Sequence, residues 1–155
     1  MYRDQHTQRM FSTLELGYSN LLLGCDRLLC LGEGATSDID RQECREVGAA
    51  LISCLENVRL LEDLSLMPAL EHLAREDPVM RHIFRRLSAE HCEDACQMEE
   101  VLETLDALAG RCPLAAGYAR LLFVGFARGM RRHVHMERYA MRRIVGIEPA
   151  TTITQ

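Results

Sequence analysis

The chain has 155 residues, of which 48% are hydrophobic and 5% aromatic, and it contains no Trp. This length fits one domain that needs no disulfide staples, and the composition favours a helical protein over a β-sandwich or a disordered chain. A formal net charge of -5 argues against general binding to nucleic acid.

Three interruptions divide the chain into four long segments. They lie at residues 31–40, 66–78 and 108–113, where Gly, Pro and Asp residues gather. Asp40 has the spacing of a helix N-cap, because Glu43 follows three residues later. Asp77 before Pro78 also fits an N-cap followed by the first helical residue.

The apolar residues of the four segments recur every three or four positions. This spacing predicts helices over 7–30, 41–66, 78–109 and 113–145. Long amphipathic helices joined by short turns favour an all-α fold, an antiparallel up-down-up-down four-helix bundle. We expect the bundle to occupy residues 1–146 and a flexible C-terminal tail to occupy residues 147–155.

The cysteines and the hydropathy bear on location. The chain has seven cysteines, an odd number, with no CxxC spacing and no charged-then-apolar leader. We therefore expect a reducing, cytoplasmic location. No apolar run approaches 18 residues, so we expect no membrane span.

Ionisable residues interrupt the apolar face of every predicted helix. A buried carboxylate without a partner costs several kcal/mol, so groups that converge from four helices need a shared compensation. A bound cation would supply it. In chain order, the candidate residues are Glu15, Glu62, His91, Asp94, His133 and Glu137.

An internal repeat strengthens this interpretation. The two halves of the chain align at an offset of 75 or 76 residues, so the second helical hairpin resembles a copy of the first. Two hairpins related by a pseudo-two-fold axis would place equivalent positions around one point, as in bundle metal sites. The equivalent pairs are Glu15 and His91, Gly34 and Gly110, Val58 and His133, and Glu62 and Glu137.

These motifs resemble the hemerythrin-like (HHE cation-binding) family of non-haem iron proteins over nearly the whole chain. The matching stretches are "LLEDLSLMPAL" with Glu62, "AEHCED" with His91, and "HVHME" with His133 and Glu137. The resemblance implies a di-iron centre that binds or reacts with O2, peroxide or NO in redox chemistry or sensing. It implies one iron held by these four residues and a second that shares the carboxylates with Glu15.

The sequence departs from the family pattern in its first half. Glu15, or Tyr18 one turn on, stands where the family has a His on the first helix, and Val58 replaces the His of the second. The second metal position would then need water, Tyr18 or Asp94 as a ligand.

Other functions remain open. The two missing family histidines favour a metal-free or metal-labile helical bundle that serves as an interaction module or in iron storage or delivery. Cys92 and Cys96, four residues apart, form a rival zinc or redox-active thiol site. Sensing and oxidase chemistry are both compatible with the motifs, as are several oligomeric states.

Overall fold

A computed structural model describes residues 5–34, 40–111 and 116–146 of the chain, and within these residues it contains helices and no strand. The predicted all-α bundle is confirmed. Residues 147–155, the predicted tail, and Pro113 lie outside the described residues. The elements are α1 (Gln5–Gly34), α2 (Arg41–Leu61), η1 (Glu62–Leu66), α3 (Met67–Ala74), α4 (Pro78–Asp106), η2 (Ala107–Arg111) and α5 (Ala116–Val145).

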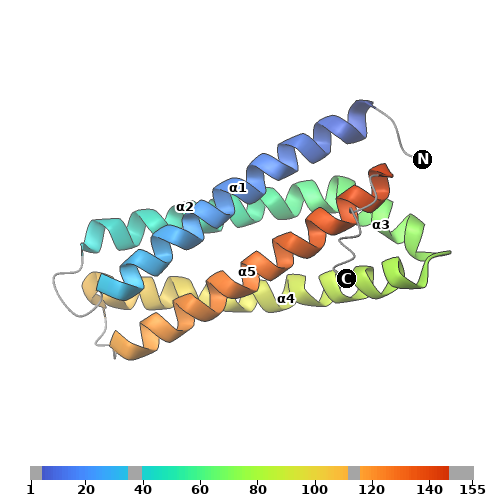
Figure 1. Cartoon of the computed structure of the whole chain (residues 1–155). Coiled ribbons are helices and arrows are strands. Elements are labelled where there is room, and N and C mark those ends of the chain that lie inside the picture. The colour runs from blue at the N-terminus through green and yellow to red at the C-terminus, as the bar shows by residue number, and fades with distance from the viewer. Residues whose placement is uncertain (1–4, 35–39, 112–115, 147–155) are drawn as a thin grey trace, which may run out of the picture.

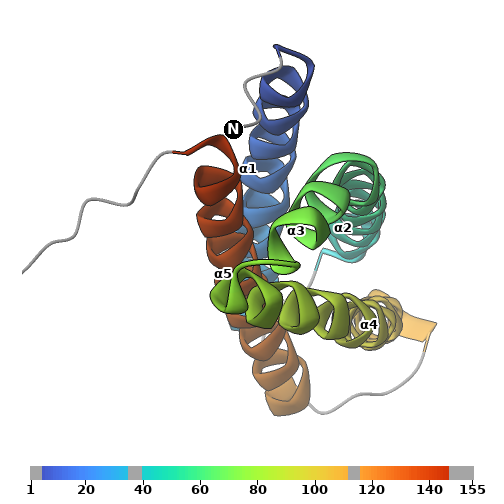
Figure 2. The same cartoon turned by 90° about the vertical axis from the view of Figure 1, so that its right-hand side faces the viewer.

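The four long helices run along one another as a bundle (Figure 1). Helix α1 packs against α2 and α5, and α4 packs against α5, α2 and α3. In the view turned by 90°, α1 and α5 run steeply up the picture while α2 and α4 recede from the viewer, and α3, which packs against α4, lies between α2 and α4 (Figure 2). The described helices include none that is long and apolar enough to cross a lipid bilayer.

Both predicted N-caps are present. The Asp40 side chain accepts hydrogen bonds from the backbone N–H groups of Gln42 and Glu43, at 2.8 and 3.2 Å. Asp77 does the same for Val79 and Met80, with Pro78 as the first residue of α4. These bonds satisfy N–H groups that have no partner within the helix.

The predicted end of the second helix at residue 66 is wrong. Helical backbone continues through the π-helical turn η1 and the short helix α3 to Ala74. Pro68 lies in the first turn of α3. Proline has no backbone N–H to donate, and the wider hydrogen-bond spacing of the preceding π-turn accommodates it in a continuous helical backbone. The Met67 N–H bonds to the Glu62 carbonyl, so the π-turn begins at a candidate metal ligand.

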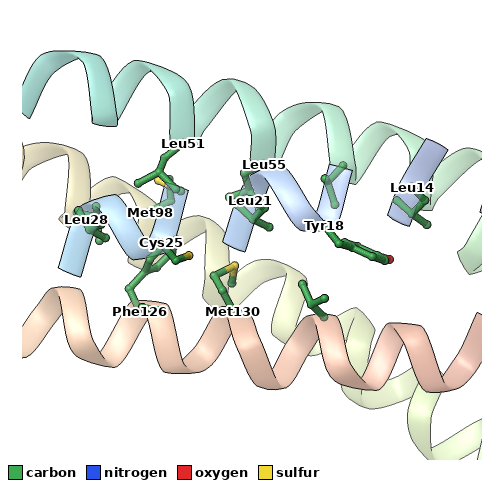
Figure 3. Close-up of a cluster of buried hydrophobic side chains, with 14 of the residues drawn as sticks. Leu14, Tyr18, Leu21, Cys25, Leu28, Leu51, Leu55, Met98, Phe126 and Met130 are labelled. Carbon is green, nitrogen blue, oxygen red and sulfur yellow. The ribbon is translucent and has the colours of Figure 1, made fainter. Parts of the chain in front are cut away.

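The bundle interior is largely apolar along its length. Side chains from all four long helices and from α3 contribute to one buried cluster, part of which is drawn in Figure 3. Tyr18 lies between Leu21 and Leu14 in this view, and its hydroxyl points away from Leu21 and Cys25. The labelled residues are Leu14, Tyr18, Leu21, Cys25, Leu28, Leu51, Leu55, Met98, Phe126 and Met130.

Helices α1 and α2 approach each other closely at two glycines. A Cβ added at Gly24 would lie 2.7 Å from Cδ2 of the fully buried Leu51, and one added at Gly17 would lie 2.9 Å from Cγ2 of Val58. Glycine at these positions therefore allows the two backbones to pack side by side.

We expect Gly24→Ala to lower the free energy of unfolding by about 1 kcal/mol or more. Overpacking of about 1–3 kcal/mol outweighs the gain in helix propensity of about 0.5–1 kcal/mol. Gly125→Ala is the matched control, because a Cβ there meets nothing within 4 Å. It should raise stability by about 0.5–1 kcal/mol. Urea denaturation measures both, and equal effects of the two variants would contradict the close packing.

Candidate metal centre

Two carboxylates and two imidazoles from three elements meet inside the bundle. Glu62 begins η1, His91 lies midway along α4, and His133 and Glu137 lie one turn apart on α5. One ligand atom from each of these residues lies within 4.8 Å of the other three. The structure therefore brings together four of the five residues that the family resemblance implied as metal ligands.

The imidazoles lie against the carboxylates. His91 Nε2 is 3.3 Å from Glu62 Oε2 and 3.7 Å from Glu137 Oε1, and His133 Nε2 is 3.0 Å from the same Glu137 oxygen. The two imidazole rings stack, with their centroids 5.3 Å apart. Glu137 is fully buried and Glu62 is 1% exposed, so this charge is far from bulk water.

The second nitrogen of His133 faces two further carboxylates. His133 Nδ1 lies 2.9 Å from Asp94 Oδ2 and 3.4 Å from Glu90 Oε2. Each carboxylate in turn meets an arginine, Asp94 with Arg59 at 3.5 Å and Glu90 with Arg86 at 2.8 Å. Carboxylates behind an imidazole fix its orientation, so His133 presents Nε2 to the cluster.

Burial and these contacts change the pKa values of Glu62 and Glu137. Burial raises the pKa of Glu62, an effect that the contact with His91 opposes and the charge of Glu137 reinforces. Burial alone would also raise the pKa of Glu137, but its contacts with His133 and His91 hold it below its ordinary value. The two carboxylates therefore favour different protonation states.

The pKa values of both imidazoles are raised, which favours their charged form. Burial would lower both values, but contacts with Asp94 and Glu137 raise the pKa of His133 to about 10. Contacts with Glu137 and Glu62 likewise raise the pKa of His91 above its ordinary value. Protons on the imidazoles thus compensate the carboxylates when no cation does so.

The cluster also fits a cation. Glu62 Oε2, His91 Nε2 and both carboxylate oxygens of Glu137 are buried and have no hydrogen-bond partner among the described residues. Metal bonds of about 2.0–2.2 Å to nitrogen and oxygen place opposite ligands about 4 Å apart, close to the spread of this cluster. Buried polar atoms without partners need compensation, and one ion among them would supply it.

Glu15 lies outside the cluster. Its carboxylate accepts two hydrogen bonds from the Arg138 guanidinium, one of them 3.0 Å long from Nε, and its side chain is 47% exposed. The buried face of α1 passes through the neighbouring Leu14 and Tyr18 instead. The structure therefore does not bring Glu15 to the position that the internal repeat assigned to it.

The buried residues correct the register of that repeat. Between α2 and α5 the offset of 75 holds, with Val58 and His133 both buried, as are Glu62 and Glu137. Between α1 and α4 an offset of 73 superimposes the inward-facing positions. These positions are Leu14 and Leu87, Tyr18 and His91, Leu21 and Asp94, Cys25 and Met98, and Leu28 and Val101.

Tyr18, the alternative to Glu15 in the sequence analysis, is thus the structural equivalent of His91. Asp94, considered there as a possible ligand, stands behind His133. The sequence analysis missed Glu90 and Arg59, although Glu90 lies one turn before Asp94 on the same helix. Cys92 and Cys96 are exposed and belong to no group of three or more potential ligands in the described part of the chain.

A helical bundle with imidazoles and carboxylates converging inside it is typical of cation-binding bundle proteins. The model of the protein family described as "Hemerythrin HHE cation binding domain" matches residues 20–143 of the chain. The chain therefore belongs to the hemerythrin HHE cation-binding family. The match includes all four clustered residues and begins after Tyr18. Comparisons with curated proteins and with solved structures found no match.

Without metal, the protein should lose stability as the pH rises from about 6.5 to about 10. The folded state raises the pKa of His133 from 6.5 to about 10, so its contribution is complete below pH 6.5 and disappears as the folded imidazole deprotonates. We expect a loss on the order of a few kcal/mol, measured by urea denaturation with EDTA present. His133→Gln should flatten the profile in this range, and a flat wild-type profile would contradict the ion pairs.

Proposed function

We propose that the chain binds one iron ion through Glu62, His91, His133 and Glu137, and that it binds or reacts with O2, peroxide or NO in redox chemistry or sensing. The observation that carries the proposal is the convergence of four ligand atoms inside the bundle, most of which have no hydrogen-bond partner among the described residues. Membership in a cation-binding family supports the same reading.

The donor set favours iron. Two imidazoles and two carboxylates combine borderline nitrogen with hard oxygen donors, a mixture common at non-haem iron centres. Two anionic oxygens stabilise the ferric over the ferrous state. When bound, iron supplies one-electron redox chemistry and affinity for diatomic ligands, whereas zinc in the same ligands would supply neither.

The geometry favours one ion over the two that the family resemblance implied. The first half of the chain has Tyr18, Val58 and Leu21 where the second half has His91, His133 and Asp94. A second ion would find the shared carboxylates but no imidazole and no outer carboxylate. Its position would be weakly held.

Residues around the four ligands orient and shield them. Asp94 and Glu90 hold the His133 ring, and Arg59 and Arg86 hold those carboxylates in place. The four residues lie within an otherwise largely apolar interior, which limits the access of water to them. This surrounding keeps the ligands in position before a cation arrives.

A metal-labile storage or delivery module is the second candidate. Its support is the set of ion pairs between Glu62 and His91 and between His133 and Glu137, which compensate the buried charge without metal. A protein that is stable in both states can release its cation. It would exchange iron or zinc readily and would not react with O2.

The cysteines bear on location. The six cysteines among the described residues are free thiols. Free thiols persist in a reducing compartment, and we include a cytoplasmic location in the proposal on this basis.

Purified protein should contain about one iron per chain by elemental analysis and should show a visible spectrum in air. Glu62→Ala and His133→Ala should each remove most of the metal, because each leaves three ligands. Glu15→Ala is the matched control on the neighbouring helix and should retain it. Loss of metal in Glu15→Ala, with retention in Glu62→Ala, would contradict the assigned ligands. A stoichiometry of two would favour the di-iron alternative.

Chelation should lower the melting temperature of the iron-loaded protein, since an ion that binds only the folded state stabilises it. The difference between loaded and chelated protein should grow as the pH rises from 5 to 8, because protons compete with the metal for the ligands. Thermal denaturation at several pH values measures this. Identical melting with and without chelator, in protein that contains no iron, would favour a metal-free module.

A further inference from the structure

A groove lies between α4 and α5 on the surface of the bundle. Its volume is about 620 Å³, which is within the range of about 300–1,000 Å³ that small-molecule sites occupy. Its walls come from the beginning of α4 and from the second half of α5, two helices that pack against each other. The groove is therefore large enough to hold a small organic molecule.

The floor of this groove is apolar. Ile83 is buried, and Met136 and Tyr139 are half-buried and pack against the hydrophobic core. Met136 and Tyr139 are three residues apart on α5, so they lie on one face of the helix. Apolar and aromatic side chains of this kind suit the hydrocarbon or aromatic part of a ligand.

The rim of the groove is basic, and no carboxylate is among the described residues that line it. It consists of three arginines and one histidine, all of them exposed: Arg86, Arg131, Arg132 and His135. The side chains of Arg132 and His135 form no ion pair or hydrogen bond within the described part of the chain. Their donors are therefore available to a ligand.

This positive charge contrasts with the rest of the molecule. The chain has a net charge of -5, yet α5 contains seven arginines and one carboxylate, that of the buried Glu137. A larger groove on the α1 side of α5 contains Glu15, whose carboxylate neutralises Arg138. The groove between α4 and α5 contains no such neutralising acid, so the ligand that it fits is an anion.

The guanidinium groups indicate which anion is favoured. Arginine binds carboxylate and phosphate groups through pairs of parallel hydrogen bonds. Arg86 is 2.8 Å from Glu90, and Arg131 pairs with Asp26, so both guanidinium groups are positioned before a ligand arrives. Positioning of this kind lowers the entropy cost of binding. Arg132 adds a guanidinium group with no partner of its own.

We propose that this groove binds a small organic anion. A carboxylate or phosphate group of the ligand pairs with the arginines at the rim, chiefly Arg132, and its apolar or aromatic body contacts Met136 and Tyr139. The two head groups share the chemistry that guanidinium recognises. The residues of the groove are different from the four that converge inside the bundle, so the proposal goes beyond the iron centre and does not rest on it.

The test titrates phenyl phosphate and benzoate, in separate experiments, into the full-length protein with and without chelator. Binding should be saturable, and the tighter of the two probes identifies the head group. In an NMR titration the methyl resonance of Met136 should shift, whereas that of Met141, in the groove on the other side of α5, should not. Inorganic phosphate and phenol each lack one half of the ligand and should bind about 10-fold more weakly or less.

Arg132→Gln is the decisive variant. Its side chain is exposed and unpaired, so the change should leave the melting temperature unaltered and weaken binding of the tighter probe about 10-fold. Arg128→Gln, one turn earlier on α5 and outside the groove, is the matched control and should bind the probe as the wild type does. Added salt should weaken wild-type binding, because it screens charges at an open site.

Four results would overturn the proposal directly. They are the absence of saturable binding by either probe, equal affinity in wild type and Arg132→Gln, binding of inorganic phosphate as tight as that of phenyl phosphate, and binding only in metal-loaded protein. The last would place the probe at the metal centre.

Two further results would assign the groove to a different occupant and would also overturn the proposal. A monomer–dimer equilibrium that Arg132→Gln abolishes, measured by sedimentation, would assign the groove to a second copy of the chain. Tighter binding of an oligoglutamate peptide than of either small probe would assign it to an acidic segment of a partner protein.

Discussion

The burial of two carboxylates at one point is the constraint on which the rest of this structure depends. Glu62 and Glu137 reach the interior from different helices and are almost completely removed from water. Unpaired, each would cost several kcal/mol, comparable to the whole stability of a small domain. The imidazoles of His91 and His133 compensate this charge directly, and Asp94 and Glu90, each with its own arginine, orient the ring of His133. Protons and a cation are therefore alternative ways to satisfy the same charge, which couples metal binding to pH.

The two helical hairpins contribute unequally to the polar cluster that compensates these carboxylates. The second contributes both imidazoles, one carboxylate and the outer carboxylates, whereas the first contributes one carboxylate and, at the equivalent positions, a phenol, a valine and a leucine. Duplication alone would place two equivalent half-sites face to face. The observed chain keeps one half-site and replaces the other with groups that cannot hold a cation unaided. Tyr18 is the exception to simple loss, because it remains polar and inward-facing.

Regular features of the fold could be predicted from the sequence, and the irregular ones could not. Helical periodicity and the Asp40 and Asp77 caps are local signals, and they gave the bundle. The π-turn at Glu62 depends on how the backbone adapts before Pro68, which no spacing rule states. The four-residue spacing of His133 and Glu137 located half of the cluster. Glu15 was misplaced because sequence alignment of the halves gave one offset, while the buried faces of α1 and α4 follow another. Glu15 follows the buried Leu14 by one residue, which turns its side chain about 100° away from the buried stripe of α1.

The apolar core of the bundle explains how the cluster of Glu62, His91, His133 and Glu137 can contain buried atoms without hydrogen-bond partners. Leu21, Cys25 and Leu28 pack with residues from the other three long helices into a continuous cluster that needs no polar partner (Figure 3). Such packing fixes the helix positions cooperatively, and local stability need not be uniform along a bundle. The apolar core therefore holds Glu62, His91, His133 and Glu137 near one another even though some of their polar atoms lack hydrogen-bond partners. Regular packing around the cluster offsets the cost of these local exceptions to polar satisfaction.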